Sequence, residues 1–184
     1  MNGRELLIGV TGGIAAYKAA ALTSQLVQAG ARVTVVMTHS ATQLVGPKTF
    51  EALTGRPVLV EQFGPGAHPH IEASETARLM CVAPATANFL GKTANGIADD
   101  LLSTMYLAFD GPVIMAPAMN VHMWDKPAVQ RNVKQLRADG VVMVDPQEGY
   151  LSCGTRGMGR MASPEAIFRV IAEQLEAVDS SSFP

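Results

Sequence analysis

The sequence predicts an α/β fold, a three-layer α/β/α Rossmann-like domain with a mainly parallel sheet. Two observations support this prediction. Short, continuously apolar runs of strand length recur along the chain, and stretches with the apolar spacing of helices separate them. Strands that are apolar along their whole length are typical of parallel sheets that helices cover on both faces.

Six runs have the composition and length of buried strands. They lie at residues 5–11, 32–38, 57–60, 79–83, 112–116 and 141–144. Helices are predicted between them from the spacing of apolar residues. They lie at residues 14–29, 87–94, 99–109 and 126–139, with a last helix that Ser163-Pro164 opens.

A chain of 184 residues has the length of one ordinary domain with a substantial core. We assign residues 1–176 to this domain and expect residues 177–184 to form a disordered tail. Hydrophobic residues make up 48% of the chain and charged residues 16%, which is typical of a globular protein. Cys81 and Cys153 lie in unlike surroundings, which argues against a disulfide framework or a zinc site and fits a cytoplasmic location.

Charge and hydropathy exclude two classes of partner. The formal net charge is -2 and no dense Lys/Arg tract occurs, so no nucleic-acid partner is expected. No apolar run approaches the roughly 18 residues that span a bilayer, so no membrane association is expected. The N-terminal residues enter a strand-like run without the apolar core of a signal peptide.

The residues that stand out follow the predicted strands. These are Gly12-Gly13 after the first strand, Thr38 and Ser40 after the second, 84–88 after the fourth and 117–120 after the fifth. Ligands of open α/β sheets bind at the carboxyl ends of the strands. We therefore expect the four loops to converge on one rim and to form the site.

The Gly12-Gly13 turn joins a strand to a helix. Glycines let the backbone approach an anion, and the helix N-terminus offers unpaired N–H groups. The glycine spacing is neither that of a dinucleotide-binding fingerprint nor that of a Walker A loop. A tight turn without a ligand is the alternative. Thr38 and Ser40 add hydroxyl donors that favour a phosphate, although helix capping also explains them.

Two further loops have the composition of ligand contacts. Residues 84–88 (PATAN) combine small side chains with Thr86 and Asn88 and suit the edge of a flat polar ring, although a capped helix start explains them too. Residues 117–124 place an amide and two thioethers beside the single tryptophan, which suggests a surface that holds a substrate. The alternative is a Met/Trp core patch in which Asn120 caps a helix.

Two side chains are candidates for proton transfer. His70 lies at a predicted helix start, a position that suits general acid–base chemistry. With His68 it could also bind a metal, but no further Cys/His/acid cluster accompanies the pair, so no metal is expected. Cys153 lies in a Gly-rich stretch, residues 149–160, that resembles a mobile flap, whereas Cys81 lies inside an apolar strand and is read as inert.

Taken together, these motifs resemble the flavin-dependent cysteine decarboxylases. The similarity runs from about Leu6 to Val170 and is specific because the motifs share an order and a spacing. The motifs are GGIAAYK at 12–18, HIE at 70–72, PATAN at 84–88, GIADDLLST at 96–104, PAMN at 117–120 and GRM at 159–161.

The resemblance implies FMN as the cofactor and assigns a role to each candidate residue. The FMN phosphate would be held by Gly12, Gly13 and Ile14 with Thr38 and Ser40, and the ring and ribityl chain by Thr86, Ala87, Asn88 and Ala118. His70 would be the catalytic base and Cys153 the proton donor. Asn120 would bind the substrate carboxylate, and Met119 and Met123 would pack nearby. The flap residues Tyr150, Leu151 and Ser152 would close over the substrate.

The activity that the resemblance implies is decarboxylation of phosphopantothenoylcysteine to phosphopantetheine in coenzyme A biosynthesis. It would proceed by transient thiol oxidation, loss of CO2 and re-reduction. The family is homo-oligomeric, so a trimer or a trimer-built dodecamer is expected, with a separate phosphopantothenate–cysteine ligase as pathway neighbour. Two stretches depart from the family pattern: residues 73–78 lack the usual basic residues, and Thr155-Arg156 replaces an acidic one.

Three other functions share this fold or cofactor. A peptidyl-cysteine decarboxylase that acts on the C-terminus of a peptide differs in substrate size, which the sequence does not reveal. A flavin prenyltransferase should lack the pair formed by His70 and Cys153. A non-catalytic flavin-binding regulatory subunit typically carries acidic extensions or lacks the cysteine, whereas Cys153 is present here.

Overall fold

The structure is a computed structural model of the chain. It describes all residues except 63–68, 151–153, 155 and 182–184, and also leaves out the side chains of residues 69, 70 and 72. The description below refers to the remaining residues.

A five-stranded sheet forms the centre of the molecule. Its order is β2-β1-β3-β4-β5, and all four neighbouring pairs are parallel. The strands are β1 (Glu5–Val10), β2 (Arg32–Met37), β3 (Leu79–Ala85), β4 (Val113–Pro117) and β5 (Val142–Met143). This confirms the predicted α/β fold with a parallel sheet. The strand order reverses direction between β1 and β3, which is where such sheets bind ligands.

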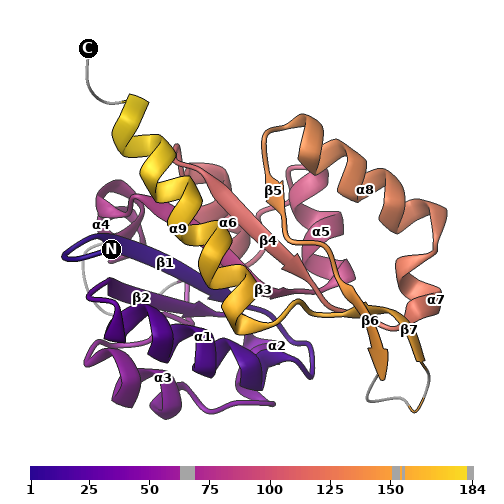
Figure 1. Cartoon of the computed structure of the whole chain (residues 1–184), viewed down its shortest axis with the longest axis horizontal. Helices are drawn as coiled ribbons and strands as arrows, with labels where there is room; N and C mark the ends of the chain where they lie inside the picture. The colour runs from indigo at the N-terminus through magenta and orange to yellow at the C-terminus, as the bar shows by residue number, and fades with distance from the viewer. Residues whose placement is uncertain (63–68, 151–153, 155, 182–184) are drawn as a thin grey trace.

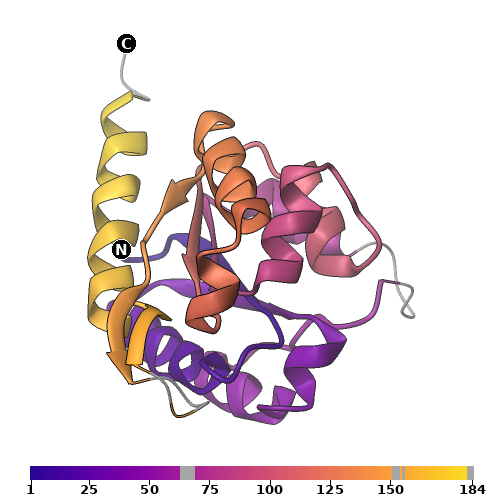
Figure 2. The same ribbon diagram turned by 90° about the vertical axis from the view of Figure 1, so that its right-hand side faces the viewer.

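Helices cover both faces of the sheet. One face carries α1 (Ala16–Gln28), α3 (Pro47–Thr54) and α9 (Pro164–Ser181). The other carries α4 (Pro69–Thr76), α5 (Ala87–Ala94), α6 (Leu101–Ala108) and α8 (Pro127–Ala138). Figure 2 shows α9 (yellow) and the helices α5 and α6 (pink) on opposite sides of the strands.

Alternating strand residues feed two separate cores. Leu6 and Ile8 of β1 pack with α1 and α9, whereas Leu7 packs with α5 and α6. Successive side chains of a strand point to opposite faces. Because both faces are buried, every position of β1 after Glu5 is apolar or glycine, which explains the continuous apolar runs of the sequence.

Three short or polar elements complete the fold. They are α2 (His39–Thr42), α7 (Val121–Trp124) and an antiparallel hairpin of β6 (Gln147–Tyr150) and β7 (Arg156–Arg160). In Figure 1 the hairpin and α7 lie beyond the carboxyl ends of the central strands. The hairpin was not expected from the sequence, because its strands are mostly exposed and lack an apolar pattern.

Two expectations differ from the structure. The strand predicted at residues 57–60 is reduced to a single bridge between Val36 and Leu59. Residues 177–181, which were expected to belong to a disordered tail, are helical, because α9 continues to Ser181. Asp179 of this last turn forms ion pairs with Arg4 and Arg78, which tie the end of the helix to the start of the sheet.

Within the described ranges, none of the helices is both long enough and apolar enough to cross a membrane.

Candidate functional site

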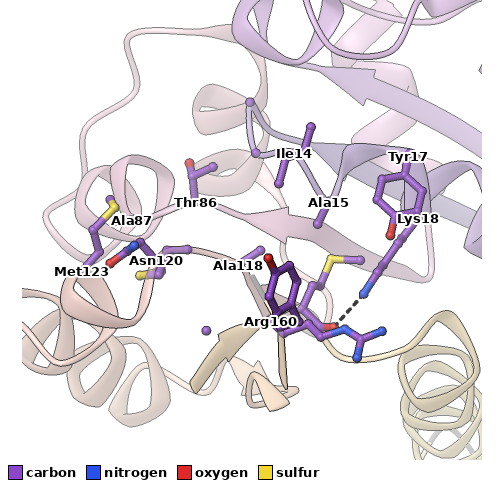
Figure 3. Close-up of a pocket in the computed structure, with 16 residues that line it drawn as sticks. Ile14, Ala15, Tyr17, Lys18, Thr86, Ala87, Ala118, Asn120, Met123 and Arg160 are labelled. Atoms are coloured by element: carbon purple, nitrogen blue, oxygen red, sulfur yellow. Dashed lines mark hydrogen bonds between the residues drawn. The ribbon is translucent and has the colours of Figure 1, made fainter. Parts of the chain in front are cut away.

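A cavity of about 470 Å³ opens at the carboxyl ends of the central strands. Its walls come from the loops that follow β1, β3 and β4 and from the β6–β7 hairpin (Figure 3). It therefore straddles the position between β1 and β3 where the strand order reverses. Its volume lies within the range of sites that hold cofactor-sized ligands.

Most of the residues that the sequence singled out line this one cavity. From the cofactor set these are Gly12, Gly13, Ile14, Thr86, Ala87 and Ala118. From the substrate set they are Met119, Asn120, Met123 and Tyr150. The expected convergence of the loops after β1, β3 and β4 is thus present in the structure.

Three predicted cofactor contacts are not among the residues that line the cavity. The Thr38 hydroxyl accepts a hydrogen bond of 3.3 Å from the Ala41 N–H and caps α2, as the alternative interpretation has it. Ser40 packs directly behind Gly12. Asn88 lies in the first turn of α5.

Four predicted residues fall outside the described part. Leu151, Ser152 and Cys153 belong to the segment between β6 and β7, and residue 70 is placed in α4 without its side chain. The roles expected for His70 and Cys153 therefore stay predictions.

The glycine turn carries backbone N–H groups that are available to a ligand. No side chain caps α1, and the N–H groups of Ile14 and Ala15 have no acceptor within the described ranges. Unpaired N–H groups at the positive end of a helix bind anions, phosphate groups above all. This end of the cavity is therefore suited to a phosphate.

Thr11 fixes the glycine turn to the neighbouring loop, a role that sequence reasoning missed. Its buried hydroxyl donates to the Pro84 carbonyl at 2.7 Å and accepts from the Thr86 N–H at 3.1 Å. The same side chain thereby joins the ends of β1 and β3 directly beneath the cavity. A hydroxyl residue at the end of an apolar strand was the only sequence signal.

We predict that Thr11→Val destabilises the protein. Valine keeps the shape but leaves the Pro84 carbonyl and the Thr86 N–H unpaired in a buried setting, which costs on the order of 2 to 3 kcal/mol. Urea unfolding measures this loss of unfolding free energy. Thr11→Ser keeps the hydroxyl and serves as the control; equal stability of the valine and serine variants would contradict the bridging role.

Asn120 both caps a helix and lines the cavity. Its Oδ1 accepts a hydrogen bond of 2.8 Å from the His122 N–H and caps α7, and the side chain also lines the cavity. Since the carbonyl end of the amide serves as the cap, the amide nitrogen is the end suited to donating to an anionic group of a ligand.

The hairpin is fastened to the loop after β4 through Gly159. The Met119 N–H donates to the Gly159 carbonyl at 3.0 Å. Gly159 has a φ of +133°, and a Cβ there would overlap the Met119 carbonyl oxygen. Glycine is therefore required at this position both for the backbone conformation and for the close approach.

We predict that Gly159→Ala lowers ligand turnover roughly tenfold, because the hairpin must move away from Met119 and Asn120. The measurement is kcat/KM of the wild type and of the variant. Gly55→Ala is the control, since Gly55 has a φ of +68° but nothing within 4 Å of an added Cβ. Gly55→Ala should therefore lose only about 1 kcal/mol of unfolding free energy, from the unfavourable backbone conformation. Wild-type turnover of Gly159→Ala would show that the hairpin position does not matter.

The run GIADDLLST at residues 96–104, one of the motifs of the resemblance, serves the fold rather than the cavity. Asp100 and Ser103 form a capping box at the start of α6. Lys92 Nζ lies 2.6 Å from Asp99 and 3.0 Å from Asp100. Burial lowers the pKa of Lys92, but the hydrogen bonds and charges of the two carboxylates together outweigh it and hold this pKa above its usual value. None of these residues lines the cavity.

Burial makes the thiol of Cys81 unsuited to proton transfer. Burial raises the pKa of the Cys81 thiol to about 12, so this thiol stays protonated. In the part of the chain that is described, no three His, Cys, Asp or Glu side chains cluster closely enough to hold a metal ion.

Comparisons with known proteins agree with this geometry. The profile of the family described as Flavoprotein matches residues 1–176. The coenzyme A biosynthesis bifunctional protein CoaBC of Bacillus subtilis is 52% identical over 185 residues, which cover 99% of this chain and 45% of that protein. The chain thus spans less than half the length of this relative.

Two solved structures are similar over almost the whole chain. The FMN-dependent cysteine decarboxylase SpaF has a TM-score of 0.82 and 36% identity, covering 95% of this chain and 96% of SpaF. A mutant PPC decarboxylase complexed with pantothenoylaminoethenethiol has a TM-score of 0.84 and 29% identity, covering 96% of this chain and 100% of that chain.

Proposed function

The chain belongs to the flavoprotein family, and from this premise we propose that it is an FMN-dependent carboxy-lyase that converts phosphopantothenoylcysteine to phosphopantetheine in coenzyme A biosynthesis. The observation that carries the proposal is that the glycine turn, which is suited to an anion, and the Met119–Asn120 loop line the same cavity. A relative named for coenzyme A biosynthesis, 52% identical, supports the choice of substrate.

The residues of the cavity fit FMN. The N–H groups of Ile14 and Ala15 suit its phosphate. Thr86, Ala87 and Ala118 offer small side chains on which a flat ring can lie, together with one hydroxyl. The chemistry that FMN supplies when bound is reversible two-electron oxidation of the CH2–SH unit, which creates the C=S electron sink that loss of CO2 requires.

The chain's own residues bind and orient the substrate and move its protons. The Asn120 amide would donate to the cysteine carboxylate and hold it beside the ring, with Met119 and Met123 packing against the substrate. His70 would take a proton from the substrate in the oxidative half, and Cys153 would give one to carbon in the reductive half. The hairpin that carries residue 153 would exclude water by closing over the cavity.

The decisive experiment supplies two substrates to the FMN-loaded protein. Phosphopantothenoylcysteine and a free peptide that ends in cysteine are incubated separately, and CO2 and product mass are measured. We expect CO2 and phosphopantetheine from the first substrate and little CO2 from the peptide. Preferred turnover of the peptide would instead identify a peptidyl-cysteine decarboxylase, and a colourless protein that cannot be reconstituted with FMN would contradict both.

We also propose a cytoplasmic homo-oligomer, a trimer or trimer-built dodecamer, that works beside a phosphopantothenate–cysteine ligase. Ile14 and Tyr17 support self-association, because they are 60% and 63% exposed at the cavity mouth, where a second copy would cover them. Light scattering coupled to gel filtration measures the oligomer mass, and a monomer at working concentration would contradict this part.

A further inference from the structure

The cavity has two chemically different ends. Figure 3 shows Asn120 and Met123 at one end and Tyr17, Lys18 and Arg160 at the other, with Ala118 between them. The first end offers an amide and thioethers, whereas the second offers two cationic side chains. Among the described residues that line the cavity, Lys18 and Arg160 are the only cationic side chains, so a ligand that fills it meets positive side-chain charge at their end.

We propose that Lys18 and Arg160 form a subsite for a phosphate monoester, and that this phosphate is the one at the distal end of the substrate. The proposal rests on the proposed function and makes it more specific. It assigns to these two side chains the choice between a phosphorylated substrate and an uncharged or peptidic one.

In the part of the chain that is described, the Lys18 ammonium group makes one hydrogen bond, and its partner is neutral. Its Nζ donates to the Met161 carbonyl at 3.2 Å, and no carboxylate lies within ion-pair distance among the described residues. Glu165 is the carboxylate that acts on it through space, but that carboxylate accepts a hydrogen bond from Gln25 at 3.1 Å. The ammonium group thus remains available to an anionic ligand.

Arg160 brings a second cation to the same end. It is the last residue of β7, and its side chain lies against Gly149 of β6, where an added Cβ would come within 2.8 Å of Arg160 Cδ. It forms no ion pair within the described ranges. Because Gly149 has no Cβ, the side chain of Arg160 can lie directly against it.

The positive charges of Lys18 and Arg160 repel each other when no anion is bound. Burial, and then the charge of Arg160, hold the pKa of Lys18 below its usual value. A phosphate between two such groups relieves the repulsion and gains charge-assisted hydrogen bonds, and a guanidinium can bind it with two parallel bonds. The two positive charges balance a phosphate dianion more fully than they balance a carboxylate, which has a single negative charge.

The position of the pair favours the phosphate of the substrate over that of FMN. The glycine turn already offers the N–H groups of Ile14 and Ala15 to one phosphate. Arg160 instead comes from the hairpin that carries the flap, and Tyr150 of the same hairpin lines the cavity. Helix α4, whose sequence is PHIEASET, contains no lysine or arginine that could serve in their place.

The test compares Lys18→Gln and Arg160→Gln with Lys134→Gln and Arg169→Gln, which remove exposed cations outside the cavity. Calorimetry on the FMN-loaded proteins measures the Kd of phosphopantetheine and of pantetheine, which lacks the phosphate. A separate titration of the apoproteins measures the Kd of FMN. KM for phosphopantothenoylcysteine and for its dephosphorylated form provides the kinetic counterpart.

We expect each cavity variant to weaken phosphopantetheine roughly tenfold or more and to leave pantetheine and FMN unchanged. The two surface variants should match the wild type, and Lys18→Arg, which retains the charge, should keep most of the preference. Thermal melting of each variant shows that it is folded.

Two results would overturn the proposal. Equal weakening of phosphopantetheine and pantetheine would mean that the residues do not act through a phosphate. Loss of FMN affinity with an unchanged phosphopantetheine preference would assign the pair to the cofactor. Failure of the proposed function gives a different result. If the protein prefers phosphopantetheine through these residues but releases no CO2, the phosphate subsite stands and the proposed reaction is wrong.

Discussion

Gly12→Ala is expected to give a folded protein that no longer retains FMN. A Cβ at Gly12 would overlap the Ser40 side chain and lie 3.1 Å from the Ser40 carbonyl carbon. The backbone of Ser40 cannot yield without moving α2, so the glycine turn must shift instead. Because the turn presents the Ile14 and Ala15 N–H groups, the shift misplaces the donors to the phosphate.

The expected loss of FMN affinity is about 100-fold, which corresponds to the loss of two charge-assisted hydrogen bonds. Fluorescence titration of the apoprotein with FMN measures it. Gly46→Ala is the control, since an added Cβ there meets nothing within 4 Å and the φ is -67°. If Gly12→Ala binds FMN as tightly as the wild type, the glycine turn is not the phosphate site.

The parts of the fold that local sequence dictates were predicted well. Helix α5 spans Ala87–Ala94 as expected, because Thr86 is a strong N-cap and the apolar spacing is helical. The buried strands β1, β2 and β3 were visible as apolar runs, since both faces of the sheet are covered. The cavity followed from one topological rule about strand ends.

The parts that long-range contacts decide could not be predicted. The hairpin forms because Gly149 pairs with Gly157 and Tyr150 with Arg156, and its strands show no apolar alternation. The end of α9 depends on Asp179, whose partners Arg4 and Arg78 come from the other half of the chain. No sequence window contains both members of such pairs.

Long-range contacts also decide which polar side chains reach the cavity, so the sequence could not identify all of them. Thr38 and Thr86 both follow strands and both cap helices, yet only Thr86 also lines the cavity. A hydroxyl that caps a helix and one that contacts a ligand have the same sequence signature. Lys18 and Met161 lie 143 positions apart, so the cationic end of the cavity became visible only in the structure.

Cys153→Ser is expected to separate CO2 release from product formation. The sequence has two thiols, and the buried one, Cys81 of β3, has a pKa raised to about 12 and cannot exchange its proton with a ligand. Cys153 lies between β6 and β7, whose described residues Tyr150 and Arg160 line the cavity. In the proposed mechanism we therefore expect Cys153 to be the thiol that protonates carbon in the reductive half.

The serine variant should still release CO2 in a single turnover, while phosphopantetheine formation falls by about 100-fold or more, the usual contribution of a positioned general acid. Mass spectrometry should show a product that lacks two hydrogen atoms relative to phosphopantetheine. Cys81→Ala is the matched control and should form phosphopantetheine normally, at a cost of about 1 kcal/mol in core packing. Normal phosphopantetheine formation by Cys153→Ser would require a different donor. The hydroxyl-bearing residues that line the cavity in the described part, Tyr17, Thr86 and Tyr150, would be the next to replace.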